Sequence, residues 1–247
     1  MRKLRFFTER KNIRTKSSVL LQEFEAEHIR STLRLSKGDE IYLFNGEKEF
    51  RAKLKLVSKG AVMAQVIEEI KVHEDKIDLH LFQGLSKAKS FEFILEKATE
   101  LGVTKIIPLE TEYSVIKIDE DKTPKKVERW GKIMRSAAKQ SERVSIPEIT
   151  EPVKFYSSLE RTFLEDYDYV IFTNPGEEQN LIDFCNEILV TDKKIRIGAF
   201  IGPEGGFSPF EIEAAKKVKD IKFVSLSQNI LRVETAAILA AGVIMMR

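Results

Sequence analysis

From about residue 75 onward, buried strands alternate with helices, and this alternation constrains the fold more than any other feature of the chain. Short runs of β-branched and aromatic residues are each followed by a longer segment with apolar residues at helical spacing. The predicted strands are residues 77–82, 105–109, 168–172, 195–201 and 221–226. Strands that alternate with helices in this way predict an α/β fold with a mainly parallel sheet.

Start and stop signals define the first two helices of this part. Ser90 is expected to cap the first helix, and Gly102 to close it. Thr123-Pro124 opens the second, with proline at its first position. The expected buried face of the second helix comprises Val127, Trp130, Met134, Ala137 and Ala138.

A third helix is expected over residues 180–189, and a last one over residues 236–246 with Thr235 as its N-cap. The last helix is apolar nearly all round, which is unusual for a helix at a protein surface. It is therefore expected either to be buried within its domain or to pack against a second subunit, which favours a homodimer.

The first 70 residues follow a different pattern, that of short strands. Residues 40–44 and 50–57 alternate apolar and polar side chains, and Asn45-Gly46 between them is a strong hairpin signal. Residues 61–67 add another strand. We therefore expect two domains, a small β-barrel or curled sheet over residues 1–72 and the α/β domain over residues 73–247.

Charge is unevenly distributed between these two parts. Residues 1–72 hold 16 Lys and Arg against 10 Asp and Glu, a net charge of +6, although the whole chain has only +2. A basic end on a near-neutral protein suits contact with a phosphate backbone, and a solvated tail is the plain alternative. Arg5, Arg10 and Arg14 are the candidate contacts to a phosphate backbone, and Gln140 and Arg143, at the end of the second predicted helix, face either a nucleic acid or solvent.

Several classes of protein are excluded by composition. Cys185 is the only cysteine, so an internal disulfide or a multi-cysteine metal site is impossible, and the three histidines lack the spacing of metal ligands. The longest apolar run, residues 236–246, is too short to span a bilayer. No apolar segment follows the basic N-terminus, so we expect no signal peptide and a cytoplasmic location.

A glycine-rich loop follows the predicted strand 195–201. The segment Gly202-Pro-Glu-Gly-Gly-Phe-Ser208 leads into Ser208-x-x-Glu211, a capping box with Pro209 at the first helical position. A P-loop would need Lys-Ser/Thr after the last glycine, and the dinucleotide fingerprint has a different spacing. Ligands bind outside the carboxyl ends of strands in such sheets, so this loop is either a ligand site or a tight turn.

The segment after the next predicted strand carries Arg232 and Glu234 at the same edge of the sheet. Together, Gly202-Pro-Glu-Gly-Gly-Phe-Ser208 and Ile230-Leu-Arg-Val-Glu-Thr-Ala236 resemble the trefoil-knotted (SPOUT) RNA methyltransferases, and within them the ribosomal RNA small subunit methyltransferase E family. The resemblance extends to residues 93–108, 130–133, 140–143, 5–7 and 28–46, and so covers essentially the whole chain.

This resemblance implies a PUA-like RNA-binding barrel, a knotted methyltransferase domain and a homodimer formed through it. It also implies S-adenosylmethionine as the cofactor and N3 of uridine U1498 in 16S rRNA of the 30S subunit as the target. The cofactor-binding residues would be Thr173, Asn174, Gly202, Glu204, Gly205, Leu226, Ser227, Ile230, Leu231, Val233 and Ala236. Two positions depart from the family pattern, namely Ser227-Gln-Asn229 in place of Gly-Pro-Arg and Tyr113 in place of arginine.

Methylation of uracil N3 requires loss of the N3 proton and stabilisation of the charge that spreads onto the flanking oxygens. Arg232 is the candidate for that cation or for a contact to the neighbouring phosphate, and Glu234 and Glu204 are candidates for general base or orienting group. The plain alternatives are a carboxylate that complements a helix N-terminus for Glu234 and a solvated loop carboxylate for Glu204. A non-catalytic RNA-binding or ribosome-assembly protein, or a knotted methyltransferase that acts on another RNA or atom, are the competing functions.

Overall fold

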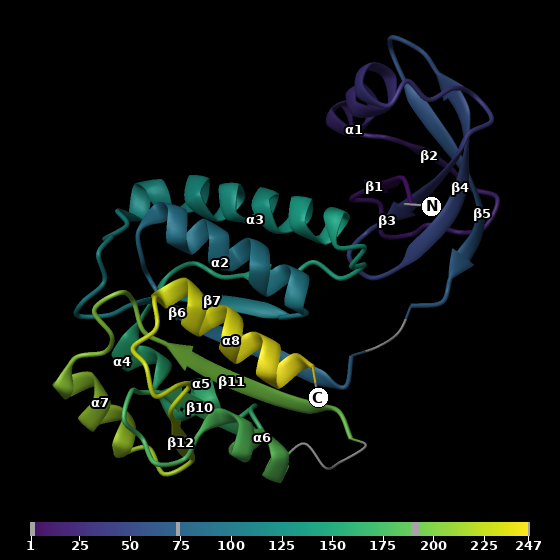
Figure 1. The fold of residues 1–247 in the computed structure, drawn as a ribbon. Coiled ribbons are helices and arrows are strands. Elements are labelled where there is room, and N and C mark those ends of the chain that lie inside the picture. The colour runs from purple at the N-terminus through teal and green to yellow at the C-terminus, as the bar shows by residue number, and fades with distance from the viewer. Residues whose placement is uncertain (1–2, 73–74, 189–192, 247) are drawn as a thin grey trace. The chain divides into compact units, whose positions relative to one another are not determined.

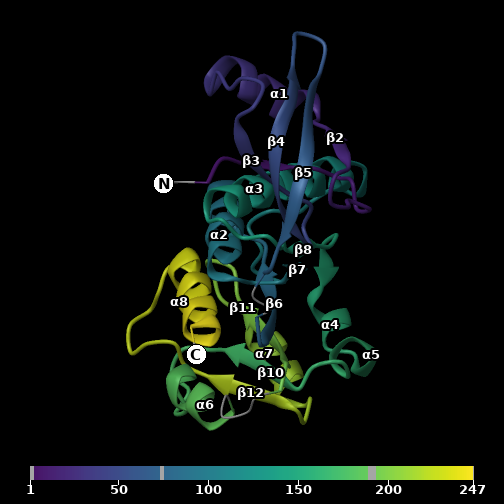
Figure 2. The ribbon, with the colours of Figure 1, turned by 90° about the vertical axis from the view of Figure 1, so that its right-hand side faces the viewer.

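The computed structural model describes residues 3–72, 75–188 and 193–246. It divides into two compact units, of which the first comprises residues 1–74 with Ala138–Ile146, and the second comprises Asp75–Ala137 with Pro147–Arg247. The chain leaves and re-enters the first unit, because the last residues of a long helix and the loop after it are grouped with the N-terminal strands. Figures 1 and 2 show the elements of both units.

The first unit is built on a five-stranded mixed sheet with the strand order β1-β3-β4-β5-β2. Its strands are β1 (Arg5–Phe7), β2 (Ser18–Leu20), β3 (Glu40–Phe44), β4 (Glu49–Val57) and β5 (Val62–Ile70), and helix α1 (Glu23–Glu27) leads into the short π-helix His28–Thr32. The predicted Asn45-Gly46 hairpin is confirmed, because β3 and β4 pair antiparallel and the Asn45 side-chain oxygen accepts hydrogen bonds from the backbone of Glu47 and Lys48.

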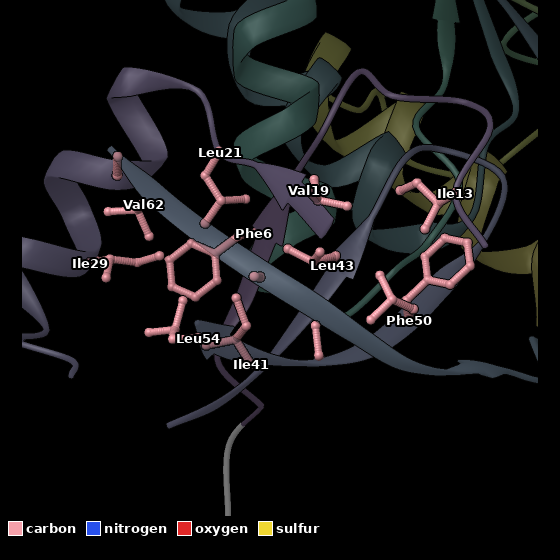
Figure 3. Packing of buried hydrophobic residues seen from close by; sticks show 14 residues of the cluster. Phe6, Ile13, Val19, Leu21, Ile29, Ile41, Leu43, Phe50, Leu54 and Val62 are labelled. Atoms are coloured by element: carbon pink, nitrogen blue, oxygen red, sulfur yellow. The ribbon is translucent and has the colours of Figure 1, made fainter. Parts of the chain in front are cut away.

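One hydrophobic cluster fills the concave side of this sheet. Phe6, Ile29 and Leu54 are almost fully buried within it. Figure 3 shows these side chains pointing into the same cluster from β1, the π-helix and β4. Two register shifts in the β4–β5 ladder increase its local twist, which lets the sheet curl around the cluster.

The second unit is an α/β fold around a parallel sheet with the order β12-β10-β11-β6-β7-β8, in which β9 also pairs with β7. Every pairing described in this sheet is parallel, as the sequence predicts. The strands are β6 (Ile77–Gly84), β7 (Lys105–Glu110), β8 (Glu148–Ile149), β9 (Val153–Lys154), β10 (Tyr169–Thr173), β11 (Ile195–Ile201) and β12 (Ile221–Val224).

Helices cover both faces of the parallel sheet (Figures 1 and 2). Helices α2 (Ala88–Leu101) and α8 (Val233–Met245) pack together on one face, with α3 (Thr123–Gln140) beside α2 and α6 (Leu181–Ile188) beside α8. Helices α4 (Phe155–Ser158), α5 (Arg161–Leu164) and α7 (Pro209–Lys216) supply side chains to the core of the other face. The predicted third helix matches α6, except that Leu189 lies outside the described residues.

Two predicted helix caps are wrong. Helix α2 begins before Ser90, at Ala88, and α8 begins before Thr235, with Arg232 in extended conformation as its N-cap. Neither N-cap residue accepts a capping hydrogen bond through its side chain. The Gly102 C-cap is confirmed, because Gly102 has the left-handed φ of +103° that closes α2.

Candidate active site

The carboxyl ends of β10, β11 and β12 carry three loops that enclose a cavity of about 320 Å³. This volume lies within the range of small-molecule sites. The eleven predicted cofactor-binding residues all line the cavity, namely Thr173, Asn174, Gly202, Glu204, Gly205, Leu226, Ser227, Ile230, Leu231, Val233 and Ala236. The structure therefore brings together residues that are up to 63 positions apart, from Thr173 to Ala236.

The glycine loop is shaped by close backbone contacts. A Cβ atom on Gly202 would lie 3.0 Å from the Cα of Gly206, and Gly206 itself has a φ of +70°. The Gly206 N–H donates to the Pro203 carbonyl at 2.9 Å and closes the turn. A Cβ on Gly84, at the end of β6, would lie only 2.5 Å from Pro203. Glycine is thus required at positions 84 and 202 because other backbone atoms lie within contact distance, and it is favoured at position 206 because of the left-handed φ.

The capping box predicted after this loop is confirmed. Ser208 Oγ accepts from the Glu211 N–H, and Glu211 Oε2 accepts from the Ser208 N–H at 2.8 Å. The other carboxylate oxygen of Glu211 accepts from the Glu112 N–H at 2.8 Å. Glu211 is buried, so one carboxylate fixes both the start of α7 and the loop that follows β7.

Glu204 has a structural partner that the sequence did not indicate. Its Oε1 accepts a hydrogen bond of 2.9 Å from the backbone N–H of Lys87, the N-cap residue of α2. This carboxylate serves the α2 N-terminus in place of the Ser90 cap that the sequence predicts. A negative charge there is also favoured by the helix dipole.

Arg232 and Glu234 lie at the start of α8, next to cavity-lining residues. Neither side chain itself lines the cavity as described, and neither makes a hydrogen bond or ion pair with any other residue that the structure describes. Arg232 is exposed and Glu234 half-buried. A guanidinium and a carboxylate without partners beside a ligand-sized cavity are available to a substrate.

Six further lining residues are not in the predicted set of cofactor contacts, namely Pro175, Ile201, Pro203, Gly206, Phe207 and Asn229. Phe207 is the most informative, because its buried ring packs against Phe172 with centroids 4.4 Å apart. It therefore joins the cavity to the core of the sheet. Tyr113, which departs from the family pattern, does not line the cavity but contacts Gly205, whose Cβ would lie 3.0 Å from that of Tyr113.

The opposite, amino-terminal edge of the sheet holds another hollow, of about 510 Å³, which is lined by a polar network. The Asp78 carboxylate binds Arg196 Nε at 2.8 Å and lies 3.3 Å from His80 Nε2, while His80 Nδ1 and the Tyr167 hydroxyl are 2.7 Å apart. Burial lowers the pKa of His80 and raises that of Tyr167. Burial also pushes the pKa of Asp78 upward, but hydrogen bonds from Thr104 and Arg196 outweigh it and leave that pKa lowered.

The predicted RNA-binding residues all lie in the first unit, but they differ in exposure. Arg10, Arg14 and Gln140 are exposed, and Arg143 is half-buried with its Nε bonded to Ser145. Arg5 is buried, which corrects the prediction for this residue. Its guanidinium binds Glu49 at 2.7 Å and the carbonyls of Ala138 and Arg143, so none of its surface is left for a phosphate.

Comparison with known proteins identifies the family. The model of the RNA methyltransferase domain family matches residues 73–245. Ribosomal RNA small subunit methyltransferase E from Bacillus subtilis is 32% identical over 224 residues, which cover 89% of this chain and 86% of the relative. The chain belongs to the ribosomal RNA small subunit methyltransferase E family. The enzyme of that name from Mesomycoplasma hyopneumoniae is also 32% identical and matches 95% of both chains.

Solved structures agree with this family assignment. A protein from Legionella pneumophila, described as a methyltransferase and solved with the cofactor SAM, superposes with a TM-score of 0.87 at 30% identity, over 100% of this chain and 98% of its own. Ribosomal RNA small subunit methyltransferase E from Neisseria gonorrhoeae, bound to S-adenosyl methionine, has a TM-score of 0.85 at 26% identity, with 97% and 95% of the two chains covered.

Two further observations concern metals and membranes. No group of three His, Cys, Asp or Glu side chains that could hold a metal ion is found in the part of the chain that the structure describes. Within residues 3–72, 75–188 and 193–246, no helix has the length and hydrophobicity needed to cross a bilayer.

Proposed function

We propose that this protein transfers a methyl group from S-adenosylmethionine to N3 of one uridine in 16S rRNA, and that it acts on the 30S subunit. The observation that carries the proposal is the three-loop cavity, in which all eleven residues expected from the family resemblance line one space. A cytoplasmic location is part of this proposal because the small ribosomal subunit is found there.

The residues of the cavity fit the proposed cofactor. Leu226, Ile230 and Leu231 offer an apolar wall for a purine, and the backbone of the glycine loop can approach a ligand closely. Thr173 and Asn174 add polar groups at the end of β10. When bound, S-adenosylmethionine supplies an electrophilic methyl group. These residues would orient the cofactor and exclude water around it.

Arg232 and Glu234 are proposed to act on the uracil ring. The Glu234 carboxylate would accept the N3 proton, since a general base is needed before N3 can act as a nucleophile. The Arg232 guanidinium would donate hydrogen bonds to the uracil oxygens, onto which negative charge spreads. Glu204, whose carboxylate is bonded to Lys87, is assigned to hold the glycine loop against α2 rather than to move a proton.

Other parts of the proposal concern architecture. We propose that residues 1–72 form a PUA-like RNA-binding domain, with Arg10 and Arg14 among its contacts, and that residues 73–247 form a trefoil-knotted methyltransferase domain. The insertion of β11 between β10 and β6, followed by the return of α8 onto α2 and β6, supports a knot. The apolar surface of α8, including the partly exposed Leu239, supports a homodimer through the second unit.

The deciding experiment incubates the protein with labelled S-adenosylmethionine and 30S subunits from a strain that lacks the modification, and then maps the labelled nucleoside. N3-methyluridine in 16S rRNA is expected. A label on a ribose or on transfer RNA would reject the target. Absence of cofactor binding in calorimetry at high protein concentration would instead favour a non-catalytic RNA-binding protein.

A further inference from the structure

Three exposed aromatic side chains lie near the glycine loop. Tyr113 is 45% exposed, Tyr156 is 56% exposed and Phe210 is 74% exposed. Single exposed apolar side chains are common on protein surfaces, but a group of them in one region marks a candidate binding site. These three belong to the loop after β7, to α4 and to α7, respectively.

These aromatic side chains are connected to the cofactor cavity. Tyr113 packs against Gly205, which lines that cavity. Phe210 is the second residue of α7, which directly continues the glycine loop. Tyr156 and Phe210 line a common groove of about 670 Å³, together with Thr111 and Ser114 on either side of Tyr113. The groove is therefore bordered by the start of α7, which continues the glycine loop, and by the loop that carries Tyr113.

Tyr113 is held in place before any ligand arrives. The Glu112 N–H is bonded to the buried Glu211 carboxylate, and the Thr111 N–H donates to Ser114 Oγ at 2.9 Å. Tyr156 packs edge-on against the buried Phe155 ring, with centroids 5.5 Å apart. A fixed aromatic side chain loses little conformational entropy when a planar group stacks on it, which makes it a favourable platform.

The groove is lined by more carboxylates than cations. Lys117 and Lys154 line it, and neither has an ion-pair partner among the described residues. Glu110, Glu112 and the buried Glu211 line it as well. Two exposed lysines can contact phosphates, but three carboxylates oppose a strong electrostatic attraction. Stacking rather than charge must therefore supply most of the affinity of this groove for a nucleic acid.

The chemistry of the proposed reaction requires an unpaired target. N3 of uracil lies on the Watson–Crick edge, so the target base must be unpaired and turned out of any stack before its N3 is accessible. The neighbouring nucleotides then need stacking partners elsewhere. We propose that Tyr113, Tyr156 and Phe210 form a stacking track that holds the single-stranded RNA adjoining the target uridine. This inference rests on the proposed function and deepens it.

The test compares Tyr113→Ala, Tyr156→Ala and Phe210→Ala with the matched control Phe93→Ala, which removes a ring of similar exposure (43%) from α2. A fluorescein-labelled oligouridylate serves as the RNA probe in an anisotropy titration. Each track variant is expected to bind it roughly tenfold more weakly, and Tyr113→Phe to bind it as the wild type does. Cofactor affinity in calorimetry should stay unchanged in all variants, and the salt dependence of oligouridylate binding should be shallow.

The outcomes separate this inference from the proposed function. If the wild type binds S-adenosylmethionine and methylates 30S subunits but the three track variants retain full oligouridylate affinity, the track is rejected and the function stands. Equal weakening by Phe93→Ala also rejects the track. A change of oligomeric state in sedimentation, with unaltered oligouridylate binding, would mean that the aromatic side chains contact a second copy of the chain and would overturn the proposal.

Discussion

Each edge of the parallel sheet carries a hollow, and the charged side chains found at the two edges differ in whether they have partners. At the amino-terminal edge, Asp78, His80, Tyr167 and Arg196 bind one another. At the carboxyl edge, Arg232 and Glu234 have no partner among the described residues, although a ligand-sized cavity lies beside them. The size of a hollow therefore says less about function than whether charged groups without partners lie beside it.

This contrast also explains why the larger hollow is the weaker candidate for a site. A ligand that entered the amino-terminal edge would have to displace hydrogen bonds of 2.7–3.3 Å that already stabilise the folded chain. A ligand in the cavity at the carboxyl edge meets apolar walls and glycine backbone, and the unpaired Arg232 and Glu234 lie next to it. The network at the amino-terminal edge is thus best understood as a connection between the starts of β6 and β11 and Tyr167.

Replacing one arginine at each edge by alanine should give the largest difference in turnover between two variants. Arg232→Ala is expected to lower turnover on 30S subunits about 100-fold, as removal of a donor to a developing oxyanion does, with little change in cofactor affinity. Arg196→Ala should leave turnover nearly unchanged but lower the free energy of unfolding by about 1 kcal/mol, because Asp78 loses a hydrogen-bond partner. Steady-state kinetics measures the turnover of both variants, and urea unfolding measures their free energies of unfolding. Equal losses of turnover would contradict the proposed difference between the two edges.

The next effect concerns the backbone of the carboxyl edge. Gly84→Ala is expected to lower the free energy of unfolding by about 2 kcal/mol and to weaken cofactor binding, because the new Cβ would lie 2.5 Å from Pro203 and displace the glycine loop. Gly131→Ala on α3 is the matched control. Its Cβ would meet nothing within 4 Å, so a gain of about 0.5–1 kcal/mol is expected from helix propensity. If calorimetry showed the same cofactor affinity for Gly84→Ala as for the wild type, the glycine loop would tolerate the displacement.

The same comparison shows what could be predicted from the sequence. The strands of the parallel sheet, the glycine loop and its capping box were predictable because they are local signals, whereas the set of residues that lines the cavity was expected only from the resemblance to the family. The starts of α2 and α8 could not be predicted in this way, and the Ser90 and Thr235 caps are wrong. At α2, the carboxylate that accepts from the N-cap residue Lys87 belongs to Glu204, which lies 117 positions further along the chain. Arg5 illustrates the same limit. Its charge suggested phosphate contact, but Glu49, 44 positions away, holds it in the interior.

A smaller effect is expected at Glu204, where a substitution tests whether the carboxylate has a structural role or transfers a proton. In Glu204→Gln the side-chain carbonyl can still accept from the Lys87 N–H, but the negative charge at the α2 N-terminus is lost. The free energy of unfolding should fall by about 0.5 kcal/mol, and turnover should change by no more than about threefold. Thermal melting and single-turnover kinetics provide the two readouts. A loss of turnover as large as that of Glu234→Gln would return Glu204 to the list of proton-transfer candidates.

The smallest effect is a pH dependence at the amino-terminal edge. Burial lowers the pKa of His80 below its ordinary value of 6.5, so the unfolded chain binds a proton more readily than the folded one. The contribution of His80 to stability is therefore complete above pH 6.5 and declines as the pH falls below that value. The contribution of Asp78 to stability is lost at lower pH than that of His80. Because the folded state lowers the pKa of Asp78, this contribution declines only below about pH 3.8.

His80→Gln separates these two windows, because an amide can accept from the Tyr167 hydroxyl and donate to Asp78 without titrating. Between pH 7 and pH 5 the wild type should lose up to about 1 kcal/mol more unfolding free energy than the variant does. Below pH 4 the two curves should run parallel, since Asp78 is present in both. Urea unfolding across this range measures the difference. Parallel curves from pH 7 downward would show that His80 is not held neutral by its surroundings, and the amino-terminal edge would then lose its description as a closed network.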